Sequence, residues 1–68
     1  MSVARVVEIS STSDKSFEDA VQQGVARASK TLRQIRSAWI KEQKVQIKDD
    51  KIVGYKVNLL VTFVLEEI

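Results

Sequence analysis

The sequence contains no cysteine, no histidine and no proline, and only two of its 68 residues are glycine. Without cysteine, no disulfide can stabilise the fold, and a chain this short buries only roughly 60% of the surface that its unfolded form exposes. We therefore expect oligomerisation to supplement a thin core. The composition, 44% hydrophobic and 29% charged, is that of one globular domain over residues 1–68 and not of a disordered chain.

The same absences limit the chemistry that the chain can perform. The side chains that usually serve as nucleophile, general base or transition-metal ligand include cysteine and histidine, and both are missing. The carboxylates are spread over the start of the predicted helix, a polar turn and the Glu66-Glu67 tail. Because no set of catalytic groups converges, we expect a protein that is not an enzyme.

Long apolar runs are also lacking. The first ten residues, MSVARVVEIS, alternate instead of forming the continuous apolar core of a signal peptide, and no run is long enough to cross a bilayer. The net charge of +2 is too small to predict a nucleic-acid or membrane partner. The sequence therefore predicts a soluble, cytoplasmic protein.

The first half of the chain predicts a strand followed by a helix. Residues 3–10 are rich in valine and favour a strand. The hydroxyl run at 10–16 is typical of turns and caps, so we expect it to end the strand, with Ser16 as the helix N-cap. From residue 17, apolar and small side chains recur at three- and four-residue spacing, which predicts an amphipathic helix to about residue 36. Gly24, inside this helix, indicates close packing against a sheet.

Basic side chains gather toward the end of this predicted helix. They are Arg27, Lys30, Arg33 and Arg36. One interpretation is a solvated face that complements the negative helix end, and the other is a phosphate-binding face. Because there is no glycine-rich phosphate loop and no interleaved aromatic residue, nucleic-acid binding is not favoured.

The second half predicts a hairpin. Strands at 38–47 and 52–66 flank a polar turn at 48–51 centred on Asp49-Asp50. With Asp49-Asp50 as the turn centre, residues whose numbers sum to 99 lie opposite each other, which pairs Trp39 with Leu60, Ser37 with Thr62, Gln43 with Lys56, Val45 with Gly54 and Ile47 with Ile52, all on one face of the sheet.

The stretch 55–65 is apolar on both of its faces, whereas one helix can cover only one. The helix is expected over Leu59, Val61 and Phe63. The opposite face carries Trp39, Leu60, Val45, Ile47 and Ile52 among polar residues, with nothing in the chain to cover it. Such a face is expected to be an interaction site between subunits.

The order strand, helix, strand, long strand resembles the dodecin family, and the residues that carry the resemblance span most of the chain. They are Val-Ala-Arg-Val-Val-Glu-Ile at 3–9 with Ser-Thr-Ser at 11–13, Ala-Arg-Ala-Ser-Lys-Thr-Leu-Arg at 26–33, and Val-Thr-Phe-Val-Leu-Glu at 61–66. The resemblance implies an α+β fold of the type β-α-β-β, in which a three-stranded antiparallel sheet wraps round one helix. It also implies assembly with itself as a hollow homododecamer.

The resemblance further implies flavin binding. Flavin-binding dodecins stack two flavins between tryptophans of symmetry-related subunits, and a glutamine on the last strand hydrogen-bonds the ring edge. The implied role is storage of riboflavin or FMN. The expected cofactor-binding residues here are Trp39, Lys56, Ser37, Gln43 and Val45.

This sequence departs from the family pattern at the site itself. Ser37 occupies the position of the family's tryptophan, and Trp39 follows two residues later, on the same face and about 7 Å further along the strand. Lys56 holds the glutamine's position, and Val64 replaces an arginine associated with coenzyme A contacts. Trp39 is thus either an interface anchor or a displaced stacking platform, and Lys56 either a solvated strand lysine or a ligand contact.

Residues 35–43, Ile-Arg-Ser-Ala-Trp-Ile-Lys-Glu-Gln, resemble a dodecin subgroup that lacks the flavin tryptophan and is described as binding calcium. The residues themselves predict no such site, because Asp49-Asp50 lacks the oxygen-rich spacing of a calcium loop. Two functions remain open: a flavin-storing dodecin with an altered site, or a flavin-less one that acts as a structural shell or binds a divalent or other ion.

Overall fold

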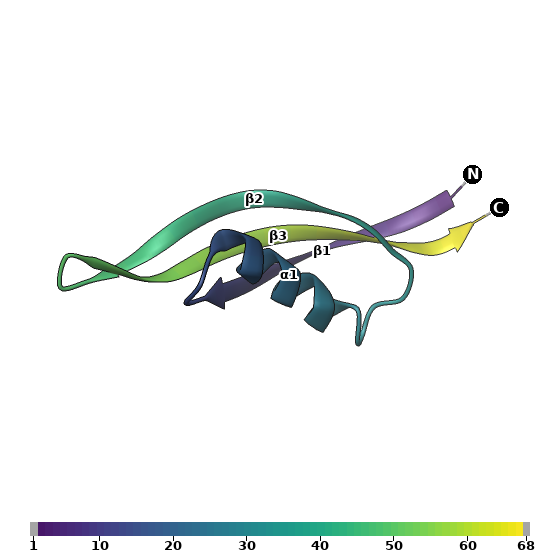
Figure 1. Ribbon diagram of the computed structural model, residues 1–68. Coiled ribbons are helices and arrows are strands. Elements are labelled where there is room, and N and C mark those ends of the chain that lie inside the picture. The colour runs from purple at the N-terminus through teal and green to yellow at the C-terminus, as the bar shows by residue number, and fades with distance from the viewer. Residues whose placement is uncertain (1, 68) are drawn as a thin grey trace.

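The computed structural model describes residues 2–67, which form three strands and one helix (Figure 1). Strand β1 spans Ser2–Ser13, helix α1 Phe17–Ala28, strand β2 Ile35–Lys48 and strand β3 Lys51–Glu67. The strands form one sheet in the order β1-β3-β2, and both neighbouring pairs are antiparallel. The α+β fold of the type β-α-β-β is confirmed.

The core lies between α1 and the central strand β3. Val57, Leu59 and Val61 of β3 are fully buried against Ala20 of α1. The close approach expected at Gly24 is present, because a Cβ added there would lie 3.1 Å from the Cβ of Ser11 and 3.2 Å from Cδ1 of Leu59. A side chain at this helix position would therefore push α1 away from the sheet.

Strand β1 does not end at residue 10 but continues through the hydroxyl run to Ser13. The hydroxyl residues do not interrupt the pairing of β1 with β3. The side chain of the buried Ser13 instead bonds to residues beyond the end of the strand. Its Oγ donates to Oδ2 of Asp19 and accepts from the backbone N–H of Lys15 at 2.9 Å. Ser16 is the N-cap, as predicted, and its Oγ accepts from the backbone N–H of Asp19 at 2.9 Å.

Helix α1 ends at Ala28, well before residue 36, so the predicted helix was too long. Local hydroxyl groups compete for the last carbonyls. Ser29 Oγ donates to the carbonyl of Ala26 at 2.8 Å, and Thr31 Oγ1 donates to that of Ala28 at 3.4 Å. Such bonds favour helix ends over helix interiors.

The chain then reverses at Gln34, which has a φ of 58°. The Gln34 carbonyl accepts from the backbone N–H of Val64 at 3.1 Å, so the following residues enter the sheet as β2. Leu32 and Ile35, the last members of the predicted helical stripe, still pack against the core, although they lie outside the helix. Their burial extended the apolar pattern beyond the true helix end.

The hairpin turn lies where it was predicted. Lys48 pairs with Lys51, and both Asp49 (φ 53°) and Asp50 (φ 62°) adopt the left-handed conformation. Two such residues between paired strands are the signature of a type I′ turn, whose twist matches that of the strands.

The predicted register holds at both ends of the hairpin but is wrong in the middle. Ile47 pairs with Ile52, and Trp39 with Leu60, as expected. Between these pairs, irregularities near Lys41 in β2 and Val53 in β3 displace the pairing by one residue. The correct partners there are Val45 with Tyr55, Gln43 with Val57, Lys44 with Lys56 and Glu42 with Asn58.

The molecule is elongated, with principal extents of 53 × 19 × 14 Å. The β2–β3 hairpin continues beyond the end of β1 and beyond α1 as a two-stranded ribbon (Figure 1). Within residues 2–67, no helix has the length and apolar character that crossing a membrane would require.

Candidate functional site

The sheet has one face packed on α1 and one that α1 does not cover, here called the helix-free face. Directly paired residues of neighbouring strands point to the same side, so the pairing assigns each side chain to a face. The helix-free face carries Ser37, Trp39, Lys44, Lys56, Asn58, Leu60, Thr62 and, from β1, Glu8.

Trp39 is the most exposed large apolar residue of this face. It lies opposite the half-buried Leu60, and 65% of its surface is accessible to solvent. A flat apolar side chain held on a sheet is a suitable platform for stacking and an equally suitable anchor for a partner subunit.

The structure brings together three of the five predicted site residues. Ser37, Trp39 and Lys56 share the helix-free face, in the register described above. The placement predicted for Gln43 and Val45 was wrong. Gln43 pairs with the fully buried Val57, and Val45 with Tyr55, so both side chains belong to the side of the sheet on which α1 packs. The displaced pairing after Lys41 is the reason, since one extra residue exchanges the faces of those that follow it.

The displaced pairing also places Lys44 directly opposite Lys56. Lys44 is exposed and Lys56 half-buried, and the two border a small depression of about 30 Å³. Glu42, Gln43 and Asn58 complete its lining. Like charges directly opposite each other in a sheet destabilise it, so this pair is an unfavourable feature of the isolated chain.

A second lysine of β2 lies between Trp39 and this pair. Lys41 Nζ lies 3.4 Å from Oε1 of Glu8, and the two side chains form an ion pair across β3. Both side chains are almost half exposed, so the ion pair contributes little stability. It does engage Lys41 with a carboxylate, whereas Lys44 faces another cation.

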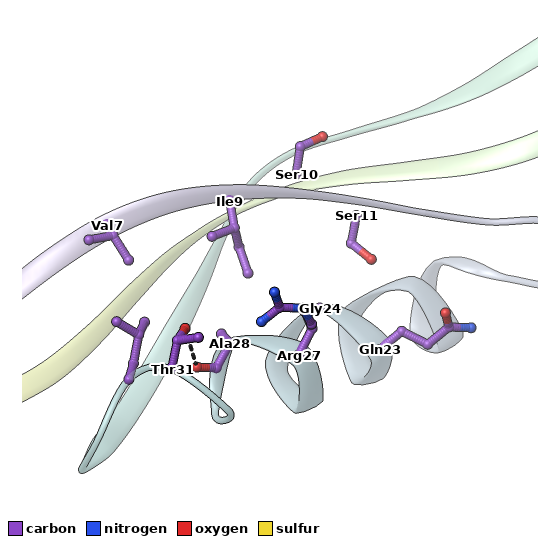
Figure 2. A pocket seen from close by; sticks show the side chains of 10 residues that line it. Val7, Ile9, Ser10, Ser11, Gln23, Gly24, Arg27, Ala28 and Thr31 are labelled. Carbon is purple, nitrogen blue, oxygen red and sulfur yellow. Dashed lines mark hydrogen bonds between the residues drawn. The ribbon is translucent and has the colours of Figure 1, made fainter.

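A hollow larger than this depression lies elsewhere, between β1 and the second half of α1 (Figure 2). It has a volume of about 680 Å³ and is lined by Val7, Ile9, Ser10, Ser11, Gln23, Gly24, Arg27, Ala28, Thr31 and Leu32. Figure 2 shows Val7, Ile9 and Ser11 pointing from β1 toward α1, and the Arg27 side chain extending toward β1. No signal in the sequence marked this groove, because it depends on the end of α1 at Ala28, earlier than the apolar spacing predicts.

The four basic residues near the predicted helix end do not form one helical face. Arg27 belongs to α1 and borders the groove, Lys30 and Arg33 lie in the connection after α1, and Arg36 belongs to β2. The early end of the helix removes the geometric basis of the phosphate-binding face considered above.

No three acidic side chains gather closely enough within residues 2–67 to hold a metal ion. Asp49 and Asp50 occupy the left-handed positions of the hairpin turn, as the turn interpretation predicts. A metal site made from one chain is therefore not evident among the described residues.

Comparison with known proteins identifies the family. The family model named Dodecin matches residues 3–66. The chain belongs to the dodecin family. It is 40% identical over 65 residues to the dodecin of Thermus thermophilus, covering 96% of this chain and 94% of that protein. The fold agrees with that of the dodecin from Streptomyces davaonensis, with a TM-score of 0.90, 32% identity and coverage of 97% of both chains.

A second kind of dodecin is also similar. The calcium dodecin of Mycobacterium tuberculosis is 35% identical over 63 residues, which cover 93% of this chain and 89% of that protein. The crystal structure of that calcium-chelating protein, which has a calcium-binding site, matches with a TM-score of 0.83 and 32% identity over 96% of this chain and 93% of the other. Dodecins of both descriptions thus share this fold.

Proposed function

We propose that this dodecin assembles as a hollow homododecamer that binds and stores a flat, flavin-type ligand, riboflavin or FMN, without catalysing its conversion. The observation that carries the proposal is the position of Trp39. It is 65% exposed on the helix-free face, and no helix or strand among residues 2–67 packs over it. A second copy related by a two-fold axis would face its own Trp39 toward the first, which creates a slot for stacked rings.

The exposed apolar surface supports assembly. Large apolar side chains that are about half or more exposed among the described residues include Val3, Val6, Trp39, Ile40, Ile47, Ile52, Val53 and Leu65. Exposed apolar patches of this kind mark interfaces, and a two-stranded ribbon such as the hairpin end is marginally stable when it stands alone in water. Contacts between copies of the chain would bury these apolar side chains.

The site differs from the family pattern in residues and not in architecture. Ser37 takes the place of the family's tryptophan, and Trp39 presents the ring on the same face of β2. Lys56 takes the place of the glutamine that contacts the ring edge. Ser37, Trp39 and Lys56 therefore form the proposed binding surface, and Gln43 and Val45, whose side chains belong to the opposite side of the sheet, are not part of it.

Two measurements on one sample test the proposal. The native mass of the purified protein is expected to correspond to a dodecamer, and equilibrium dialysis against riboflavin is expected to show saturable retention. A monomer that retains no flavin would reject both parts. A dodecamer that retains none would reject the flavin role while keeping the assembly.

The second candidate is a flavin-less dodecin that forms a structural shell or binds an ion such as calcium. It is favoured by the similarity to the calcium dodecin and by the absence of the tryptophan at residue 37. No three acidic side chains gather within residues 2–67, so a calcium site with three or more carboxylate ligands would need side chains from several subunits. Calorimetric titration of the assembled particle with calcium distinguishes the two: heat of binding with calcium and none with riboflavin favours the shell.

A further inference from the structure

We propose that the hairpin end of one copy of this chain, residues 46–54, docks in the groove between β1 and α1 of a neighbouring copy. The inference rests on the assembly proposed above and deepens it, because it names the two surfaces that join one pair of subunits. Both surfaces are separate from the binding surface around Trp39, so the contact does not depend on whether a flavin binds there.

The hairpin end has an apolar side that the chain leaves uncovered. Ile47 pairs with Ile52 on the side of the sheet on which α1 packs, and 64% and 54% of their surfaces are exposed. The next pair toward the turn, Lys48 and Lys51, points to the opposite side, because side chains alternate along a strand. Neither β1 nor α1 extends along the hairpin end (Figure 1). The ribbon is therefore apolar on one side and basic on the other.

The groove offers an apolar surface that can receive this side. Val7, Ile9 and Leu32 contribute to its lining, and its volume is about 680 Å³. A cavity of about 150 Å³ already holds a benzene molecule, so the groove has room for both isoleucine side chains of a hairpin end. Because β1 is an edge strand of the sheet, another copy can reach the groove from beside it.

Arg27 of the groove and Asp49 of the turn have opposite charges. The exposed Arg27 side chain extends toward β1 (Figure 2), and within residues 2–67 no acceptor binds its guanidinium group. Asp49 follows Ile47 by two residues and lies at the tip of the hairpin. Isoleucine side chains seated in the groove would therefore bring the Asp49 carboxylate to Arg27, where the two form a charge-assisted pair.

This contact forms between copies and not within one chain. Ile9, in the groove, pairs with Leu59 of β3, whereas Ile52 lies at the hairpin end of the same strand. The seven positions between Leu59 and Ile52 correspond to roughly 23 Å along a strand, so a chain's own hairpin end cannot fill its own groove. Because the hairpin end and the groove are different surfaces, the contact is head-to-tail, and repeated contacts of this kind close into a ring when the rotation allows it.

Cross-linking tests the contact directly, because the chain has no cysteine of its own. A chain with Gln23→Cys beside the groove and Ile52→Cys at the hairpin end is treated with a short bismaleimide. We expect a ladder of covalent dimers, trimers and larger species, and almost no product from either single variant. The matched control combines Gln23→Cys with Lys51→Cys, which points to the opposite side of the ribbon, and should lose most of the product.

The outcomes separate this contact from the assembly as a whole. A particle with the mass of a dodecamer that gives no ladder would overturn the contact and leave the assembly intact, with the groove free for a small ligand. Dimers from Gln23→Cys alone would show that two grooves meet each other, which would also overturn it. A monomer that gives no ladder would reject the contact and the proposed assembly together.

Charge removal gives a second readout on chains without cysteine. Arg27→Gln and Asp49→Asn are each expected to raise several-fold the protein concentration at which the particle dissociates, since asparagine still tolerates the left-handed backbone of the turn. The double variant should be little worse than either single one, because both substitutions remove the same pair. Arg33→Gln, at an exposed arginine away from the groove, should have little effect. Fully additive effects of Arg27→Gln and Asp49→Asn would contradict the pairing.

Discussion

Trp39 lies directly opposite Leu60 on the face of the sheet that α1 does not cover, and 65% of the tryptophan surface is exposed. Leu60 belongs to the same strand as the fully buried Leu59 and Val61, so β3 is apolar on both of its faces. One face is covered by the chain's own helix. The other, with Trp39, is left uncovered by the helix.

Moving the ring back to residue 37 tests whether Trp39 acts as a stacking platform. Trp39→Leu is expected to abolish riboflavin binding, because leucine has no flat face on which a ring can stack. Adding Ser37→Trp to that variant is expected to restore binding, since residues 37 and 39 share one face. Equilibrium dialysis measures both.

The control for this exchange is the native mass. If Trp39 were chiefly an interface anchor, Trp39→Leu would dissociate the assembly, and the loss of flavin would follow from that. An intact particle without flavin supports the platform, whereas a dissociated one supports the anchor.

Gly24→Ala is expected to lower the free energy of unfolding, by about 1–2 kcal/mol. Alanine gains about 1 kcal/mol in helix propensity. Its Cβ, however, would lie 3.1 Å from the Cβ of Ser11 and 3.2 Å from Cδ1 of the fully buried Leu59, both closer than ordinary van der Waals contact. Denaturant titration at constant protein concentration measures the change. Gln22→Ala, at an exposed position of the same helix, should have little effect, and a Gly24→Ala protein that is more stable than the original would show that the helix and sheet are not packed this closely.

Asp50→Gly is expected to stabilise the hairpin by about 1 kcal/mol, because Asp50 has a φ of 62° and glycine adopts that conformation without a steric penalty. Lys48→Gly, at a neighbouring extended position, should instead lower stability. Thermal unfolding under matched conditions compares the two. The Asp50→Gly protein should also bind calcium no differently from the original, and a marked loss of calcium binding would contradict the assignment of Asp49-Asp50 to the turn alone.

Ser16→Ala is expected to cost about 1 kcal/mol, since the Ser16 side chain accepts from the backbone N–H of Asp19 at 2.9 Å and no other residue replaces it as the N-cap. Ser16→Asp should retain most of the stability, because aspartate caps equally well. A loss of the same size in both variants would mean that the serine matters for a reason other than capping.

The parts of the fold that sequence reasoning predicted are those with strong local chemistry. Ser16 has a hydroxyl suited to capping, Gly24 lacks a side chain where the sheet approaches, and Asp49-Asp50 tolerates left-handed backbone. Each of these features depends on one or two residues whose side chains favour one local structure, so each could be predicted from the sequence.

The parts that it missed depend on contacts distant in sequence. The irregularities near Lys41 and Val53 leave no mark in composition, and because they lie on opposite strands, the register is restored at Trp39. The pairings at the two ends of the hairpin therefore agreed with a simple register, while Gln43 and Val45 between them were assigned to the wrong face. Ile47 and Ile52 pair as predicted, but they also lie on the side of the sheet on which α1 packs and not on that of Trp39. The Lys44–Lys56 pair could not be predicted for the same reason.

The helix end was missed because burial does not distinguish a helix from the turn that follows it. Leu32 and Ile35 pack on the core at helical spacing, yet the hydroxyls of Ser29 and Thr31 end the helix near Ala28. The groove beside Arg27 arises from that same region and was missed with it.

The most direct test of the central claim, that Trp39 on the helix-free face holds a flat ligand between copies, is its emission during titration with riboflavin. Trp39 is the only tryptophan of the chain, so the signal has one source. On a particle whose mass is that of a dodecamer, the proposal predicts saturable quenching. Unchanged emission from the same particle, at riboflavin concentrations well above that of the protein, would contradict it and assign Trp39 to subunit packing.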